Sequence, residues 1–241
     1  MQRFDGRSPD APRPVQFHRN FTENAEGSVL VVVGRTKVLC TVSAVPSVPP
    51  WQANKGKGWL TAEYAMLPGS VEGRKQRETL RRDGRSVEIQ RLIGRSLRAV
   101  TDLTGFPNWT LHVDCDVIQA DGGTRCAAIT GACVALHDAL RALAGRKQLN
   151  HWPMREFVGA VSVGLVGGQT LLDLNYGEDF EAAVDMNVIA TASGKIVEVQ
   201  ATAEDEPFPR ADFDAMVDLG VVGVRQLCEL QHAAVEGGIP V

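Results

Sequence analysis

The sequence has none of the residue patterns that mark several common kinds of site. Its five cysteines include no CxxC pair, and its five histidines include no HxxxH or HExxH pair, which argues against a zinc centre. A GxxxxGK[ST] stretch is also missing, which excludes a Walker A nucleotide loop. Neither the polar residues 1–14 nor any later segment approaches an apolar membrane span, so we expect a soluble, cytoplasmic protein with no membrane partner.

The composition is that of an ordinary globular protein. The 241 residues are 44% hydrophobic and 22% charged, which is enough to bury a substantial core. The odd number of cysteines indicates reduced thiols, because Cys115 falls on the apolar face of a predicted strand, and Cys126 and Cys133 fall on that of a predicted helix. The net charge of −4 argues against a protein that coats nucleic acid along its whole surface.

Charge is strongly segregated along the chain. Residues 74–98 contain nine Lys or Arg and three Asp or Glu, a net charge of +6 that leaves −10 for the rest. A basic zone on an acidic body is typical of a local binding surface for a polyanion.

The clearest candidate site is a glycine-rich turn between a strand and a helix. Residues 111–117 alternate apolar and polar side chains, and from Cys126 onward apolar residues recur at the three- and four-residue spacing of a helix face. The turn between them contains Gly122, Gly123, Thr124 and Arg125. Glycine amides, a helix start and a guanidinium together favour an anion. The alternative is a purely structural turn in which Thr124 is the N-cap.

A second basic element lies at another predicted helix start. Arg85 follows Asp83 and Gly84 and precedes the apolar positions Ile89 and Leu92. Taken alone, Arg85 is better explained as a solvated surface residue. Two arginines that each open a helix instead suggest a site for inorganic phosphate or a nucleotide phosphate.

The third element is acidic. Asp185 stands between the apolar residues Val184 and Met186 of a predicted strand, so its carboxylate needs a partner, a metal or a catalytic role. Asp179, at a predicted hairpin bend six residues earlier, is either a second functional carboxylate or an ordinary turn residue. Two aspartates near a phosphate suit Mg²⁺, so Asp179 and Asp185 are the candidate catalytic and metal-binding residues.

The predicted elements follow a similar order in the two halves of the chain. A hairpin over 29–44, further strands and a helix are echoed by a hairpin over 159–171, strands at 184–190 and 195–201, and a helix from about 211 to 236. We interpret residues 1–241 as a single α+β domain built from two similar halves, roughly 1–150 and 151–241.

Several blocks of the sequence resemble the signature motifs of the bacterial ribonuclease PH family, in the family's order and as far as about Glu204. They are FDGR at 4–7, KGWLTAEY at 57–64, EIQRLIGR at 88–95, DCDVIQADGGTR at 114–125 and DMNV at 185–188. The resemblance implies the ribonuclease PH fold and a ring-shaped homohexamer arranged as a trimer of dimers. Gly69 departs from the pattern, because the family usually has an arginine there, and this puts one RNA contact in doubt.

The resemblance also implies an activity. It is phosphate-dependent 3′→5′ trimming of tRNA precursors and of rRNA, which releases nucleoside 5′-diphosphates and is reversible, with no role for DNA. Inorganic phosphate is the implied co-substrate and Mg²⁺ the implied metal. Arg85, Gly123, Thr124 and Arg125 resemble the family's phosphate site, and Asp179 and Asp185 its catalytic carboxylates. The implied tRNA-gripping residues lie between 70 and 82 and are Arg74, Lys75, Arg77, Arg81 and Arg82.

Two other functions remain open at this point. A hydrolytic 3′ exonuclease would need a larger carboxylate cluster for two metals and would gain nothing from a phosphate site. A catalytically silent RNA-binding ring subunit of an exosome-like assembly would have no use for both the glycine turn and the aspartate pair. Polynucleotide phosphorylase, the larger relative, is excluded by length.

Overall fold

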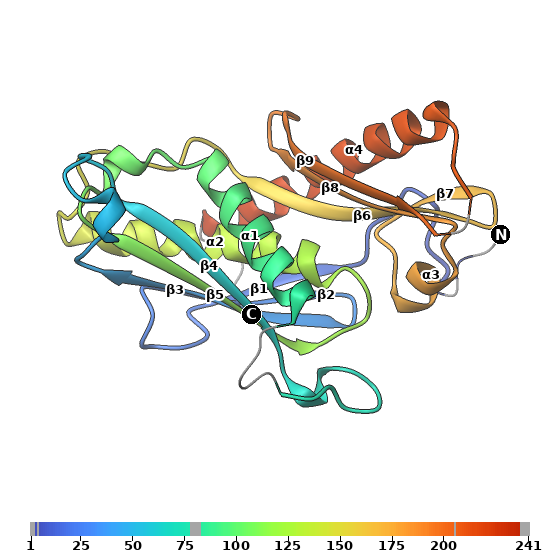
Figure 1. Ribbon diagram of the computed structural model, residues 1–241, viewed down its shortest axis with the longest axis horizontal. Coiled ribbons are helices and arrows are strands. Elements are labelled where there is room, and N and C mark those ends of the chain that lie inside the picture. Colours follow the sequence, from blue (N-terminus) through green and yellow to red (C-terminus); the bar gives the residue numbers. More distant parts are fainter. Residues whose placement is uncertain (1–2, 4, 78–82, 205, 237–241) are drawn as a thin grey trace.

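The computed structural model of the chain describes residues 3, 5–77, 83–204 and 206–236. Within them the chain forms two β-sheets and four α-helices (Figure 1). The α+β fold class predicted from the sequence is therefore confirmed. The division into two similar halves of one domain stays a prediction.

The first sheet has five strands in the order β1-β2-β3-β5-β4. Only the β4–β5 pair is parallel, and the other pairs of this sheet are antiparallel. A two-residue turn joins β2 and β3, because Val33 pairs with Thr36 and Gly34 supplies the positive φ of 56°. The strands are β1 (Val15–Arg19), β2 (Gly27–Val33), β3 (Thr36–Val45), β4 (Trp59–Met66) and β5 (Thr110–Gln119).

The second sheet has four antiparallel strands in the order β7-β6-β8-β9. They are β6 (Val158–Val166), β7 (Gln169–Leu172), β8 (Val184–Thr191) and β9 (Ile196–Ala203). The strands predicted at 184–190 and 195–201 are confirmed. The bend predicted between the two acidic segments is instead a short helix, α3 (Tyr176–Glu181), because Asn175 and Glu178 form a capping box there.

Helix α2 (Thr124–Gly145) is the centre of the fold. It packs against β2 and β3 of the first sheet and against β6 of the second. By length and composition α2 could cross a membrane, contrary to the expectation that no segment approaches such a span. However, 83% of its most apolar stretch is buried inside the protein, as in the core helix of a globular protein. The other long helices are α1 (Gly84–Ala99), which covers β4, and α4 (Arg210–Val235), which covers β6 and β8.

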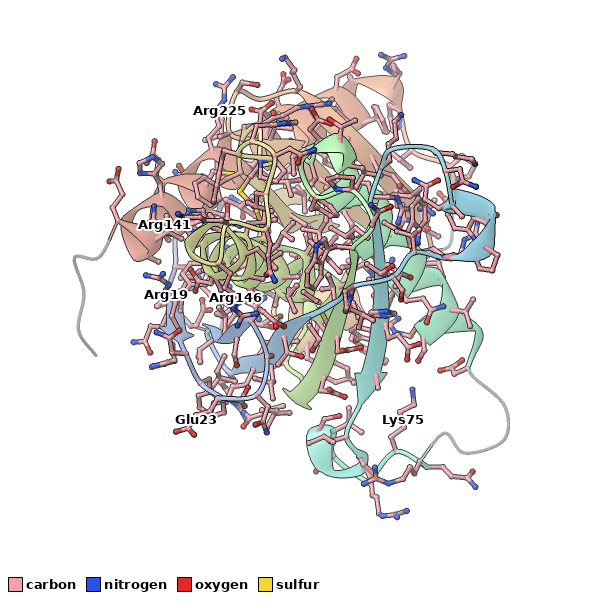
Figure 2. The ribbon with its side chains drawn as sticks, turned by 90° about the vertical axis from the view of Figure 1, so that its left-hand side faces the viewer. Arg19, Glu23, Lys75, Arg141, Arg146 and Arg225 are labelled. Carbon is pink, nitrogen blue, oxygen red and sulfur yellow. The ribbon has the colours of Figure 1, made fainter. Side chains whose placement is uncertain are left out.

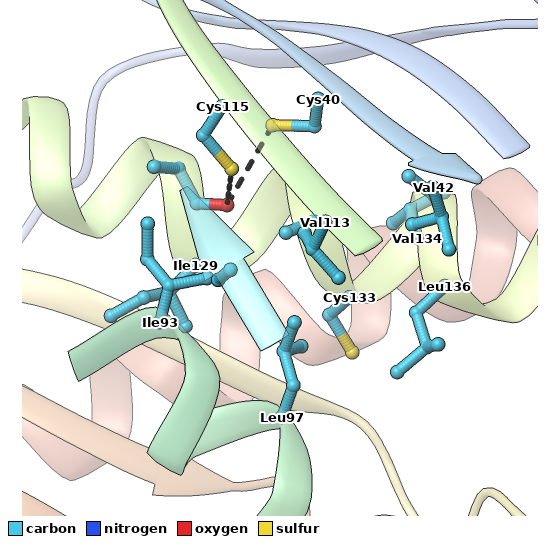
Figure 3. Packing of buried hydrophobic residues seen from close by; sticks show 14 of the residues in the cluster. Cys40, Val42, Ile93, Leu97, Val113, Cys115, Ile129, Cys133, Val134 and Leu136 are labelled. Atoms are coloured by element: carbon cyan, nitrogen blue, oxygen red, sulfur yellow. Dashed lines mark hydrogen bonds between the residues drawn. The ribbon is translucent and has the colours of Figure 1, made fainter. Parts of the chain in front are cut away.

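The cysteines lie in the core, as predicted, and all five are free and buried. Figure 3 shows Cys40 and Cys115, which face each other on β3 and β5, with both sulfur atoms near the carbonyl oxygen of Ala128 on α2. Burial raises the pKa of the Cys133 thiol to about 12, so this side chain acts as a small apolar residue rather than a nucleophile.

Buried ion pairs tie the N-terminal segment to the turn between β7 and α3. Arg13, which is 4% exposed, makes two bonds of 2.7 and 2.9 Å to the carboxylate of Asp173, and its own amide donates to the same group. Arg3 makes two bonds of 2.7 Å to Glu178. Burial alone would raise the pKa of Asp173, but the hydrogen bonds and charge of Arg13 outweigh burial and lower it. The segment before β1 is thus joined to the turn after β7 and to α3 by buried ion pairs, and separating these charges would cost much free energy.

Replacing Arg13 with methionine should lower the free energy of unfolding by about 3–5 kcal/mol, because the buried Asp173 loses its closest cation and keeps only Arg7, which lies 3.8 Å away. Because the pKa of Asp173 is lowered, the wild-type pair contributes fully above the unfolded pKa of about 3.9 and is lost as the pH falls below it. Chemical denaturation at pH 7 and pH 3 measures both effects.

The matched control is Arg210→Ala, which breaks the exposed Arg210–Asp214 pair and should change stability by less than about 1 kcal/mol. Equal stability of the Arg13→Met variant and the wild type would contradict the importance of the buried pair.

Candidate functional site

The glycine turn lies where β5 ends and α2 begins. Gly122 and Gly123 have φ angles of 74° and 63°, a conformation that residues with a Cβ rarely adopt. The hydroxyl of Thr36 holds the turn, because it donates to the Gly122 carbonyl at 2.8 Å and accepts from the Asp121 amide at 2.9 Å. A Cβ on Gly122 would lie 2.7 Å from the carbonyl oxygen of Leu174. The turn therefore packs directly on the segment that leads into α3.

The start of α2 is open to an anion. Gly123 is the N-cap and Thr124 is the first helical residue, so the alternative with Thr124 as N-cap is wrong. Because glycine has no capping side chain, the first amides of α2 keep their capacity to donate to an anion. The hydroxyl of Tyr64 on β4 donates to the Thr124 hydroxyl at 2.9 Å. That bond directs the proton of Thr124 away from Tyr64.

The start of α1 is organised differently. Asp83 is the N-cap of α1, and its carboxylate accepts from the Arg85 amide at 3.2 Å. The helix end is thus already capped by a negative side chain, which weakens its own attraction for an anion. The exposed guanidinium of Arg85 is the group that this helix contributes to the site.

The two arginines converge on the two aspartates. Arg85 and Arg125 each lie close enough to Asp179 and Asp185 to oppose the rise of their pKa values. Arg125 donates to the side chain of Gln200, on β9 of the second sheet, at 2.8 Å and lies 3.6 Å from Glu88 on α1. Residues from α1, α2, α3 and β8 therefore lie within electrostatic reach of one another.

The surroundings raise the pKa values of both aspartates. Burial and the neighbouring Asp179 raise the pKa of Asp185 to about 6, although Arg125 opposes the shift. Asp179 keeps contact with solvent, yet the surrounding chain desolvates its carboxyl and raises its pKa as well. Two carboxylates that repel each other in this way are stabilised by a proton or a cation between them.

The aspartate pair fits a magnesium ion but does not form a complete metal cage. Among the described residues no group of three or more His, Cys, Asp or Glu side chains could hold a metal. Mg²⁺ commonly takes one or two carboxylates and completes its shell with water and phosphate oxygens. Asp179 and Asp185 would supply those two carboxylates.

The predicted RNA-gripping segment projects from the end of β4. Figure 2 shows Lys75 on this projecting segment. Arg74 and Arg77 are exposed, and Lys75 forms an ion pair with Asp83 at 3.2 Å. Arg81 and Arg82 lie outside the described residues. A Cβ on Gly69 would meet nothing within 4 Å, so the fold does not require glycine where the family usually has arginine.

Four residues around the site were not predicted from the sequence. They support the turn or Arg125 and are Arg13, Thr36, Tyr64 and Gln200. The sequence contains a signal for Arg13 only, and that signal is its partner Asp173. Asp173 stands between two leucines, so, like Asp185, it is a carboxylate in an apolar segment that needs a buried partner. The partner itself could not be named, since Arg13 lies 160 residues away in the sequence.

Replacing Tyr64 with phenylalanine should weaken the binding of inorganic phosphate roughly fivefold, because one hydrogen bond of about 1 kcal/mol no longer orients the Thr124 hydroxyl. Burial raises the pKa of Tyr64, which keeps the hydroxyl protonated and able to donate. Titration calorimetry with phosphate measures the effect. The control is Tyr176→Phe on the other tyrosine, which is 63% exposed. Equal phosphate affinity of Tyr64→Phe and wild type would mean that Tyr64 only fills the core.

Comparisons with known proteins identify the family of this chain. The profile of the 3′ exoribonuclease family, domain 1, matches residues 11–141, and that of domain 2 matches residues 156–223. Ribonuclease PH of Acaryochloris marina is 54% identical over 233 residues, which cover 97% of this chain and 98% of the relative.

Solved structures show the same fold. Rrp46 of rice (Oryza sativa) superimposes with a TM-score of 0.80 at 22% identity, covering 97% of this chain and 100% of that one. A chain of the Archaeoglobus fulgidus exosome with RNA bound to its active site superimposes with a TM-score of 0.78 at 25% identity, covering 95% and 92%. The chain belongs to the 3′ exoribonuclease family of ribonuclease PH proteins.

Proposed function

We propose that this protein is a phosphorolytic 3′→5′ exoribonuclease, which removes the last nucleotide of RNA with inorganic phosphate and releases a nucleoside 5′-diphosphate. The observation that carries the proposal is the convergence of Arg85 and Arg125 on Asp179 and Asp185. A site with both cations and carboxylates suits a reaction in which an anion attacks a phosphodiester. The close relative named ribonuclease PH supports it.

The reaction needs little covalent chemistry from the protein. Arg85, Arg125 and the Gly123–Thr124 turn would hold phosphate so that one oxygen attacks the last phosphorus in line, as the bond from phosphorus to the departing 3′ oxygen breaks. The arginines neutralise the charge on the transferring group. With its pKa raised to about 6, Asp185 can hold a proton near the departing oxygen.

Mg²⁺ is the metal that this site suits best. When bound by Asp179 and Asp185, Mg²⁺ would neutralise the charge of the phosphate oxygens and reduce the electrostatic repulsion between the two carboxylates. The reaction would be reversible, because it breaks a phosphodiester bond and forms a diphosphate bond. When nucleoside diphosphates are abundant, the same site would add nucleotides to the RNA 3′ end and release phosphate.

We further propose that the main substrates are tRNA precursors, with rRNA as another, and that the protein acts in the cytoplasm as a homohexamer arranged as a trimer of dimers. The exposed Arg74 and Arg77 give each copy a basic projection beside the site. Several copies in a ring would place these projections around one RNA, which raises local positive charge and effective concentration.

The silent-subunit alternative is disfavoured because both the cationic and the acidic residues of the site are in place. The hydrolytic alternative is disfavoured because the described part of the chain has no carboxylate cluster large enough for two metals. RNA shortening with and without inorganic phosphate separates these three functions.

Replacing Arg125 with alanine should lower turnover on the order of 100-fold and raise the phosphate concentration required, while RNA affinity stays close to wild type. The reason is that Arg125, in the first turn of α2 and hydrogen-bonded to Gln200, would neutralise the phosphate bound at this helix start. Initial rates at varied phosphate give this result directly. Arg91→Ala, which removes an exposed arginine from α1, is the matched control. An equal loss of RNA affinity and turnover would assign Arg125 to RNA binding instead.

Replacing Asp185 with asparagine should keep the fold and remove at least about 100-fold of the activity, because the amide has the same shape but cannot hold a metal or a proton. Asp116→Asn is the control, since Asp116 is a half-buried aspartate of the first sheet whose pKa is also raised by burial. Rates of diphosphate release and thermal unfolding are compared for both variants. Full activity of Asp185→Asn would make its carboxylate structural.

Replacing Arg74 and Arg77 together with alanine should flatten the salt dependence of RNA binding, by about 0.7–0.9 log–log units for each RNA phosphate that the variant no longer binds. Binding titrations at several salt concentrations measure the slope. Light scattering should give six copies of the 26.0 kDa chain for wild type and variant alike. An unchanged slope, or a smaller assembly, would assign the segment to contact between subunits.

A further inference from the structure

Two aromatic side chains lie exposed beside the carboxylates. Tyr176 is 63% exposed and Phe180 is 81% exposed, and no other large apolar side chain in the described residues exceeds the value for Phe180. Both belong to α3, and their ring centroids lie 6.5 Å apart with a tilt of 33° between the planes. Core packing accounts for neither ring, because solvent surrounds most of each.

The helix places these rings next to Asp179. Residues three and four positions apart lie on the same side of a helix, so Tyr176, Asp179 and Phe180 share one side of α3. Asp179 interacts electrostatically with Arg85 and Arg125. The aromatic side of α3 therefore borders the anion-binding residues. Figure 1 shows α3 projecting from the second sheet, apart from the helices that cover the two sheets.

The negative charges around α3 favour the approach of RNA bases over RNA phosphates. Besides Asp179, α3 carries the exposed Glu181, and Glu204 lies close enough to raise the pKa values of both catalytic candidates. An RNA phosphate against this surface would be repelled. A nucleobase is neutral and flat, and it stacks favourably on an exposed aromatic ring whatever the RNA sequence. The bases would then face α3 while the backbone faces the arginines.

We propose that Tyr176 and Phe180 form a stacking platform for the nucleobases of the last two nucleotides at the RNA 3′ end. The proposal rests on the proposed function, because a scissile bond beside Asp179 is what brings the RNA end to α3. Stacking would align the end of the chain without a base preference. Such a platform suits an enzyme that shortens RNA of any sequence one residue at a time.

The test measures RNA binding at equilibrium in the absence of phosphate. Alanine at Tyr176 or at Phe180 should raise the dissociation constant for a single-stranded oligonucleotide roughly 5- to 100-fold. Tyr176→Phe and Phe180→Tyr keep a ring and should bind as the wild type does. With an oligonucleotide that lacks a base at one of its last two positions, the dissociation constants of the alanine variants and the wild type should differ less. With an oligonucleotide that lacks a base far upstream, they should differ as much as with intact RNA.

Phe21→Ala is the matched control. Phe21 is 50% exposed and follows Arg19 by two residues. Arg19 pairs with Asp138 of α2, which lies about 21 Å along the helix axis from Thr124. Its removal should leave RNA affinity unchanged. Light scattering of every variant should give the mass of the wild type.

Three results would overturn the platform. They are unchanged RNA affinity of both alanine variants, an equal loss on intact and terminally abasic RNA, and a smaller assembly for the alanine variants, which would make the rings a contact between copies. Diphosphate release by the wild type is assayed separately with phosphate present. Its absence would overturn the proposed function, whereas the binding measurements alone decide the stacking.

Discussion

The buried pair of Arg13 and Asp173 is the interaction on which the site depends. The guanidinium of Arg13 binds Asp173 in the turn between β7 and α3 and donates to the Asp121 carbonyl at 2.6 Å in the glycine turn. A Cβ on Gly123 would lie 2.9 Å from the same guanidinium. One charged group thus fixes the distance between the start of α2, which offers amides and Arg125, and the β7–α3 segment, which carries Asp179. Because both charges are buried, any shift that separates them is costly, and the turn is held rigid.

The second constraint is the balance of charge at the site. Burial raises the pKa values of Asp179 and Asp185, and Arg85 and Arg125 oppose the rise. A bound phosphate would offset the positive charge of the same arginines. The two carboxylates would then bind a proton or a cation more readily. Gln200 and Glu88 hold Arg125 before any ligand binds, so its orientation costs little when the anion arrives. The site therefore suits the binding of an anion at the arginines together with a cation at the carboxylates.

Local patterns predicted most of the elements and the residues that meet at the site. Alternation at 111–117, the helix spacing after Cys126 and the carboxylate within an apolar run each gave a direct local signal. What could not be predicted depends on contacts across the sequence. Tyr64 reaches Thr124 across 60 residues, and Gln200 reaches Arg125 across 75. The short helix α3 lies where the sequence predicts a bend, because six residues are too few to show a helical period.

The most direct measurement follows the oxygen atoms of inorganic phosphate. RNA is incubated with the protein and with phosphate labelled in all its oxygens, and the released nucleotides are analysed by mass spectrometry. We predict nucleoside 5′-diphosphates that carry the label in the terminal phosphate, because an oxygen of the phosphate held at Arg85, Arg125 and the glycine turn attacks the last phosphodiester. Unlabelled nucleoside monophosphates, formed at the same rate without phosphate, would contradict phosphorolysis and show that water is the attacking group.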